Sequence, residues 1–377
     1  MPLFTILLHV GLIGGASVPA SPRTVTPRSS AAANADDLEA TVRRACSEFC
    51  VLEGIIAQRR VRAKEQAPFA CLGAGSLASL LDEYDTFVFD CDGVLWSGSL
   101  GLLPGAAAML SELERRGKRC IFVTNNSARS REGYAKKFAA LGLSVAAEQI
   151  VPASFVAARW LKRAKPGISA ALVIGEEGVS EELRAAGIEA VRADAGTPFD
   201  EAAFASAMPD AQVGAVVVGA DAAFSFAALA AASLYLEQAD CLFVATNDDA
   251  YDVVGGRRLP GNGCLVAAVQ TACGRPPDAV CGKPSSDLAQ YLLAEVTPPI
   301  EAARCLVVGD RMDTDVALAH AMGASSLLVL TGVSRAADAA RAIAGLPRCP
   351  TAVASHLGAL LELEGEAEGV AAGDGAP

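Results

Sequence analysis

The sequence has few histidines and no CxxC pair of cysteines, which narrows the chemistry available to it. The only histidines among its 377 residues are His9, His320 and His356, and His9 lies in an N-terminal segment of unusual composition. A Ser/His/Asp hydrolase or a histidine-rich metal site needs imidazole as base or ligand, so both are disfavoured. The 11 cysteines are scattered without a CxxC pair, which argues against a zinc ribbon or a disulfide framework and fits a reducing compartment.

Basic residues are also scarce. Lys and Arg number 31 against 43 Asp and Glu, which gives a formal net charge of -12. Binding to a phosphate backbone requires clustered positive charge, so we expect no nucleic-acid partner. Hydrophobic residues make up 52% of the chain, enough for a large buried core, and the length suggests two domains.

The first 36 residues differ in composition from the rest and predict a targeting leader or a disordered extension. An uncharged apolar run from Leu3 to Gly15 is too short to span a bilayer but suits the hydrophobic region of a signal peptide. Arg23 and Arg28 then lie among Ser, Thr, Pro and Ala, with no acidic residue before Asp36, as in transit peptides.

The two parts together resemble the bipartite leaders of plastid proteins in algae with complex plastids, although no basic residue precedes the apolar run. We therefore expect a plastid location, with a cytoplasmic protein as the alternative. No membrane span is expected in the mature protein, and residues 366–377 are expected to form a disordered tail.

A charged segment from Asp37 to Gln66 predicts an amphipathic helix within an N-terminal extension over residues 37–80. Its apolar residues recur at steps of four and three, at Leu38, Val42, Ala45, Phe49, Leu52 and Ile56. One stripe of this length predicts a helix packed on its own domain; pairing with a second copy is the alternative.

From about Glu83 onward, short apolar runs alternate with helical segments. AALVIG, GAVVVGAD, CLFVATN and RCLVVGD end in Gly, Asp or Asn, and stretches such as FAALAAASLYLEQ separate them. This alternation predicts an α/β fold with a doubly wound parallel-sheet (Rossmann-like) core and ligands at the carboxyl ends of its strands. We expect the core to span residues 81–166 and 276–365, with an inserted α/β cap domain over residues 167–275.

Two carboxylates, Asp90 and Asp92, follow the predicted strand in FVFDCDG. Like charges this close repel strongly in a low dielectric, so the pair needs a cation, a shared proton or open water. The alternative is a solvated turn, in which Asp is common.

Three other polar groups follow predicted strands or precede helices, and one crevice would collect them all. They are Thr124 with Asn125, Lys283 in CGKPSS, and the acids from Asp310 to Asp315 in VVGDRMDTD. Asp90 and Asp310 would supply hard oxygens for Mg²⁺, and a lysine ammonium suits a phosphoryl oxygen. The helix that starts in SARSREGYAKK would offer free backbone N–H groups to a phosphate.

In this order, FDCDGVLW, FVTNNS, CGKPS and VVGDRMDTD resemble the four motifs of the haloacid dehalogenase superfamily of phosphohydrolases. Connecting segments such as LPGNGCLVAAVQTACGRPP and LLVLTGVS are similar to the branch of phosphoglycolate, pyridoxal and 4-nitrophenyl phosphatases. The resemblance covers roughly residues 82–363. Four ordered motifs are far more specific than a single DxDG.

The resemblance implies a Mg²⁺-dependent phosphomonoesterase that acts through an aspartyl-phosphate on a small phosphorylated metabolite. The substrate expected first is 2-phosphoglycolate, which arises in plastids from oxygenation during carbon fixation and enters photorespiration, and the alternatives are pyridoxal phosphate or a broad range of phosphomonoesters. A homodimer through the cap is also implied. A catalytically idle binding protein of the same fold is the alternative of another class, but such a relative would be expected to have lost a motif residue.

The resemblance also assigns roles to the motif residues. Asp90 would attack phosphorus, and Asp92 would protonate the leaving oxygen and then activate water. Phosphate would be bound by Thr124, Asn125 and Lys283.

The remaining acids would serve the metal. Mg²⁺ would be held by Asp90, Asp310 and the main-chain carbonyl of Asp92. Asp313 and Asp315 would orient waters or Lys283 from outside the metal's ligand set. Ordinary N-capping of a helix is the alternative for Asp313.

Substrate choice would come from the cap, because the motif residues meet only the phosphoryl group. The loop ATNDDAYDVVGGRRLPGNG carries Tyr251, Arg257 and Arg258. A small carboxylated substrate would need a cation there, whereas pyridoxal phosphate would need aromatic surface, which this loop largely lacks. An ordinary solvated turn is the alternative for each of these side chains.

Overall fold

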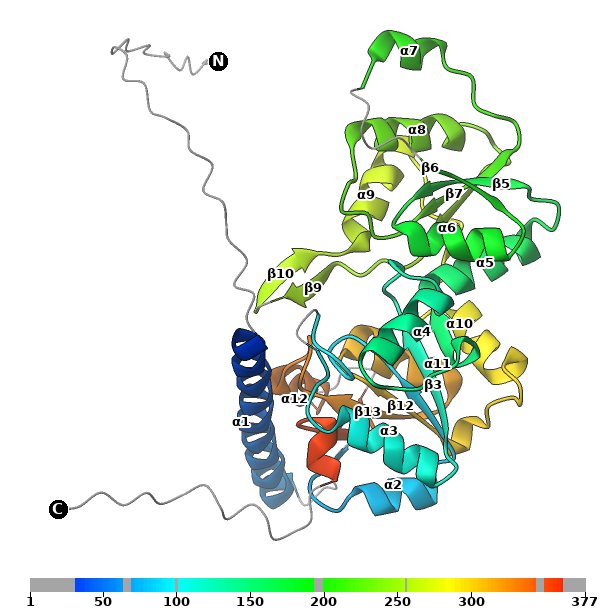
Figure 1. The fold of residues 1–377 in the computed structure, drawn as a ribbon. Coiled ribbons are helices and arrows are strands. Elements are labelled where there is room, and N and C mark those ends of the chain that lie inside the picture. The colour runs from blue at the N-terminus through cyan, green and yellow to red at the C-terminus, as the bar shows by residue number, and fades with distance from the viewer. Residues whose placement is uncertain are drawn as a thin grey trace, which may run out of the picture.

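The computed structural model describes residues 31–63, 69–98, 101–192, 199–254, 256–343 and 349–361. Most of the predicted leader and the predicted tail lie outside these ranges. The described chain forms two α/β units, each built on its own parallel sheet, together with a long N-terminal helix and a projecting hairpin (Figure 1).

The first unit contains a seven-stranded sheet in the order β1-β14-β13-β12-β2-β3-β4, with every neighbouring pair parallel. Its strands are β1 (Ala70–Cys71), β2 (Thr86–Phe89), β3 (Arg119–Thr124), β4 (Ile150–Pro152), β12 (Cys305–Gly309), β13 (Ser325–Val329) and β14 (Ala352–Ala354). All residues of the central strands β2 and β12 are buried, as expected for a parallel sheet covered on both faces.

Helices flank this sheet and connect its strands. They are α2 (Leu77–Glu83), α3 (Ala106–Arg115), α4 (Arg131–Ala140), α5 (Ala153–Ala164), α10 (Ser286–Gln290), α11 (Ala317–Met322) and α12 (Ala336–Ile343). The predicted doubly wound core is confirmed.

The second unit is inserted between the two halves of the first, as predicted. Its sheet has the order β11-β8-β7-β5-β6 and is also parallel. The strands are β5 (Ala170–Ile174), β6 (Glu189–Arg192), β7 (Val213–Val218), β8 (Leu242–Ala245) and β11 (Ala279–Val280), and the helices are α6 (Glu177–Ala185), α7 (Glu201–Ser206), α8 (Phe226–Leu236) and α9 (Asn262–Cys273). Strand β11 lies just beyond the expected boundary at residue 275.

An antiparallel hairpin, β9 (Tyr251–Val254) and β10 (Arg257–Pro260), leaves the second unit and reaches toward the first. Figure 1 shows it above the N-terminal end of α1 (Ala31–Ala63). The hairpin therefore lies between the two sheets on the side where α1 begins.

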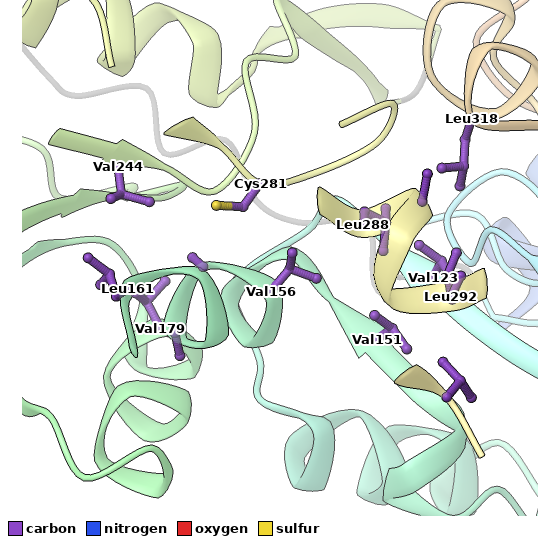
Figure 2. Packing of buried hydrophobic residues seen from close by; sticks show 14 of the residues in the cluster. Val123, Val151, Val156, Leu161, Val179, Val244, Cys281, Leu288, Leu292 and Leu318 are labelled. Carbon is purple, nitrogen blue, oxygen red and sulfur yellow. The ribbon is translucent and has the colours of Figure 1, made fainter. Parts of the chain in front are cut away.

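The two units share one apolar cluster. Val123 and Val151 of the first sheet pack with Val156 and Leu161 of α5, and the cluster continues to Val244 of the second sheet (Figure 2). This continuous buried layer fixes the second unit next to the first.

Helix α1 confirms the predicted amphipathic helix but begins at Ala31, inside the segment expected to be leader. Ala45 and Leu52 are completely buried, in a cluster that includes Leu328 of β13 and Ala339 of α12. The helix therefore packs on its own core, as expected. Among the helices that the structure describes, none is long and apolar enough to cross a membrane.

Candidate active site

The predicted polar groups meet where three neighbouring strands end. Asp90 directly follows β2, Asp310 directly follows β12, and Thr124 is the last residue of β3. The N–H of Asp90 donates to the carbonyl of Val308 at 2.8 Å, so β2 and β12 stay paired up to the acids. All three side chains belong to residues that are buried.

Lys283 reaches the same point from the segment after β11. Its Nζ lies 2.7 Å from Oδ1 of Asp90 and 2.8 Å from Oδ1 of Asp315. Burial acts to lower the pKa of Lys283, but the charges of Asp315 and Asp90 outweigh it and raise that pKa. The lysine is therefore a permanent cation between two carboxylates.

Acids outnumber this cation. Ligand oxygens of Asp90, Asp310 and Asp315 lie within 4.8 Å of one another. Burial and the neighbouring acids Asp90 and Asp315 raise the pKa of Asp310 well above its usual range. Burial also raises the pKa of Asp315 to about 6, although Lys283 acts against this rise. A further cation would relieve the repulsion among these groups.

The oxygens available at this point suit a hard divalent ion. Oδ1 of Asp310 is buried and, among the described residues, has no hydrogen-bond partner, while its Oδ2 accepts from the N–H of Val333. Asp315 is already engaged, because its Oδ2 accepts from the N–H groups of Asp310 and Arg311. Asp90 and Asp310 could therefore hold such an ion, whereas Asp315 is paired with Lys283.

Two glycines make room for this cluster. A Cβ at Gly332 would lie 1.8 Å from Oδ2 of Asp310, so only glycine fits. Gly93 has φ of 84°, in the left-handed region, and a Cβ there would lie 2.9 Å from the same carboxylate. The close packing of backbone against Asp310 explains both residues.

Asp92 lies beside the cluster with one free oxygen. Its Oδ1 accepts from Nε1 of Trp96 at 2.8 Å, while its buried Oδ2 has no hydrogen-bond partner in the described part of the chain. Burial raises the pKa of Asp92, and nearby Lys137 opposes the rise. A raised pKa suits a group that gives and takes a proton near neutral pH.

Thr124 and Asn125 both line the cavity, and both make hydrogen bonds within the site. Oγ1 of Thr124 accepts from the N–H of Asn126, and the Thr124 hydroxyl is also hydrogen-bonded to the side chain of Tyr134. Asn125 uses its side chain internally: Nδ2 donates to Asp249 at 3.0 Å, and Oδ1 accepts from the N–H of Lys283 at 2.7 Å. Asn125 thus ties β3 to the lysine segment and to the residues before the hairpin.

The helix start that was expected to bind phosphate is occupied. Ser130 caps α4 by accepting from the N–H of Gly133, and Oε1 of Glu182 accepts from the N–H of Arg131 at 2.7 Å. Glu182 comes from α6 of the second unit. The Arg131 amide therefore links the two units, and both amides already have partners within the protein, contrary to the sequence expectation.

Arg311 was not singled out from the sequence, although it directly follows Asp310. It forms a bidentate pair with Asp313, at 3.0 and 2.9 Å, so Asp313 does not orient Lys283. Its Nη1 donates to the carbonyl of Tyr251 at 3.0 Å. Arg311 therefore links the acid cluster to the hairpin.

A cavity of about 860 Å³ lies over the cluster, walled by the core, the hairpin and the first turns of α1. Asp252, Val254 and Leu259 of the hairpin line it, whereas the three predicted specificity residues do not. Instead, the Arg258 guanidinium stacks 4.3 Å from the ring centroid of Tyr251. None of the cavity-lining residues in the described ranges is aromatic.

Two family models match the chain. One, described as haloacid dehalogenase-like hydrolase, matches residues 87–189, and the other, described as HAD-hydrolase-like, matches residues 280–360. Chronophin of Rattus norvegicus is 41% identical over 274 residues, which cover 71% of this chain and 83% of that protein. Phosphoglycolate phosphatase 1A, chloroplastic, of Arabidopsis thaliana is 40% identical over 264 residues, which cover 68% and 71%.

Solved structures of phosphatases are also similar to this chain. The 4-nitrophenylphosphatase from Thermotoga maritima superposes with a TM-score of 0.62 at 27% identity and covers 74% of this chain and 97% of its own. Glycerol phosphate phosphatase from Mycobacterium tuberculosis in complex with magnesium also gives 0.62, at 33% identity, with coverage of 75% and 78%.

Proposed function

Because this chain belongs to the haloacid dehalogenase-like hydrolases and is a phosphoric monoester hydrolase, we propose that it dephosphorylates a small metabolite through an aspartyl-phosphate on Asp90. The geometry that supports this role is the pairing of Asp90 with Lys283 at the end of β2. The alternative of an idle binding protein loses its support, since each motif group is retained in a coherent site.

In the proposed first step, a carboxylate oxygen of Asp90 attacks phosphorus and the bond from phosphorus to the leaving oxygen breaks. Asp92 gives its proton to that oxygen, and the Thr124 hydroxyl and Lys283 stabilise the charge on the phosphoryl group. In the second step Asp92 takes a proton from water, which attacks the aspartyl-phosphate and releases inorganic phosphate. Asp90 is then a free carboxylate again.

We propose Mg²⁺ as the cofactor, held by Asp90, Asp310 and the main-chain carbonyl of Asp92. The unpartnered Oδ1 of Asp310 supports this assignment. When bound, the ion supplies positive charge that offsets repulsion between the acids and an anionic substrate. Asp315 keeps Lys283 in place beside this group.

We propose 2-phosphoglycolate as the substrate. The observation that favours it over pyridoxal phosphate is the lack of aromatic side chains among the described residues of the cavity wall. A pyridine ring gains affinity by stacking on such side chains, whereas a two-carbon acid does not need them. The similarity to a phosphoglycolate phosphatase agrees with this choice.

The test is the release of inorganic phosphate from 2-phosphoglycolate, pyridoxal 5'-phosphate, glycerol 3-phosphate, phosphotyrosine and 4-nitrophenyl phosphate. Each substrate is measured with Mg²⁺ and with a chelator. We expect the highest kcat/KM for 2-phosphoglycolate and loss of turnover in chelator. A preference for pyridoxal phosphate would reject the proposed substrate, and metal-independent turnover would reject the proposed cofactor.

We propose that the second unit acts as a cap over the core, with the boundaries given above. Closure over a bound phosphate would exclude water and bring the hairpin to the leaving group. Specificity contacts from Tyr251, Arg257 and Arg258 stay a prediction, since these residues do not line the cavity. Pairing of two copies through the cap also stays a proposal, which the exposed Met208 and Phe226 support.

We also propose a plastid location, which the composition of the leader and the similarity to a chloroplastic enzyme support. A fluorescent reporter fused behind residues 1–36 should enter the plastid of an algal host. Diffuse cytosolic fluorescence would contradict this proposal.

A further inference from the structure

The N-terminal helix forms one wall of the catalytic cavity. The cavity is lined by three residues from successive turns near the start of α1: Asp37, Thr41 and Arg44. Just beyond them, the completely buried Ala45 and Leu52 anchor the helix on the core. This wall is therefore held by the core and does not depend on the position of the second unit.

Arg44 meets the cavity with its charge incompletely compensated. Its Nη2 donates to the carbonyl of Thr331 at 3.2 Å, and its nearest carboxylate oxygen, on Glu48, lies 3.9 Å from Nε. That Nε is buried and, within the described chain, donates no hydrogen bond. Glu48 is shared with Arg335, whose Nη1 lies 3.9 Å from the same oxygen. One carboxylate thus serves two guanidinium groups without a close contact to either.

The other cations among the described residues of the cavity wall are already paired with carboxylates. Lys283 lies between Asp90 and Asp315, and Arg311 forms its bidentate pair with Asp313. Among the described residues of the cavity wall, Arg44 is the cation that lacks a carboxylate within hydrogen-bond distance.

Arg44 also lies close to the phosphate end of the cavity. Thr331, which accepts its hydrogen bond, is followed by Gly332 and Val333, and both of these contact the carboxylate of Asp310. The hydroxyl of Thr331 donates to the carbonyl of Gly93 at 2.5 Å, next to Asp92. Arg44 is therefore hydrogen-bonded to the segment that packs against Asp310, and it lines the same cavity as Asp90.

We infer that Arg44 of the N-terminal helix binds a second anionic group, a carboxylate, on the leaving group of the substrate. The inference rests on the proposed function in placing the phosphoryl group at Asp90. A guanidinium suits this role because its planar N–H groups match a carboxylate, and the contact is strong where water is partly excluded. Helix α1 then forms a wall of the cavity that selects carboxylated substrates.

The test compares the binding of two phosphonates to the full chain in Mg²⁺ by isothermal titration calorimetry. Phosphonoacetate carries a carboxylate, whereas methylphosphonate has the same phosphonate without it, and neither is hydrolysed at a P–O ester bond. In the wild type we expect phosphonoacetate to bind about tenfold more tightly or better. Arg44→Ala should remove this preference, and Arg44→Lys should retain part of it.

Two matched variants serve as controls. Arg43→Ala removes an exposed arginine of the same helix, whose partner is Glu39, and should leave the preference at the wild-type value. Arg257→Ala with Arg258→Ala removes the two hairpin cations. A cooperative thermal unfolding transition is required of each variant as the check that it is folded.

The outcomes separate this inference from the proposed function. Equal weakening of both phosphonates in Arg44→Ala, or no change in either, would overturn it, as would loss of the preference in the hairpin double variant alone. Loss of the preference in Arg44→Ala supports it even if 2-phosphoglycolate proves a poor substrate. In that case the carboxylate site stands and the proposed substrate fails.

Discussion

The Nζ atom of Lys283 lies 2.7 Å from Oδ1 of Asp90, although the whole second unit separates the two residues in the sequence. Asp90 is positioned by the end of β2, and Lys283 by the segment that returns from β11. Asn125 fixes that segment by accepting from the N–H of Lys283. The site therefore joins residues from both sides of the inserted unit.

Replacing Lys283 with methionine should both destabilise and inactivate the protein. The change leaves Asp90 and Asp315 buried without their shared cation, and loss of one partner of a buried pair costs about 3–5 kcal/mol. Urea unfolding in the absence of metal measures the loss. Lys118→Met, which breaks a pair with the exposed Asp85, is the control and should cost far less. Equal losses in the free energy of unfolding for the two variants would show that the buried ion pair stabilises the fold no more than the exposed one.

Replacing Asp92 with asparagine should slow turnover by roughly a hundredfold or more, because the general acid and base is lost. The loss should be larger for 2-phosphoglycolate than for 4-nitrophenyl phosphate, since nitrophenolate leaves without needing a proton. Steady-state kcat for the two substrates measures this difference. An unchanged rate would reduce Asp92 to a residue that only shapes the turn.

The metal should stabilise the protein more at neutral than at acidic pH. Burial raises the folded-state pKa of Asp315 to about 6 from an ordinary value of 3.8, and it raises the pKa of Asp310 well above its usual range. Raised carboxyl pKa values mean that the metal-free fold loses stability as pH rises from about 4 through about 6. Mg²⁺ should therefore raise Tm clearly at about pH 7.5 and much less at about pH 5. Equal shifts at both pH values would contradict this origin of the effect.

The N-terminal helix should behave as part of the core. Leu52→Ala removes a completely buried side chain and should lower the free energy of unfolding by about 2–4 kcal/mol. Val51→Ala, next to it and 59% exposed, should change it by less than about 0.5 kcal/mol. Urea unfolding of both variants makes the comparison, and equal effects would mean that α1 is not packed as described.

The sequence is sufficient to predict the fold and the meeting of the motif residues. Asp90, Thr124 and Asp310 each follow an apolar run, and parallel strands bring their carboxyl ends to one edge of the sheet. The stripe through Ala45 and Leu52 likewise predicts a helix with one buried face. These features depend on local periodicity and on a general rule of topology.

Other features depend on contacts between distant segments, which periodicity does not reveal. Glu182 accepts a hydrogen bond from the first backbone N–H of α4, and Asp313 pairs with Arg311 instead of Lys283. The pattern of the hairpin does not tell which of its residues line the cavity. The stripe of α1 shows that one face is buried, but not that Arg44 reaches the active site.

The central claim is that Asp90 is the nucleophile, and trapping the covalent intermediate tests it most directly. Folded Asp92→Asn protein is mixed with 4-nitrophenyl phosphate and Mg²⁺, quenched in acid, digested and analysed by mass spectrometry. With the general base removed, the phosphorylated enzyme should hydrolyse slowly and accumulate. We predict the added mass of one phosphoryl group on Asp90 and none when Asp90→Asn is also present. A phosphoryl group on another residue, or full turnover by a folded Asp90→Asn protein, would contradict the account.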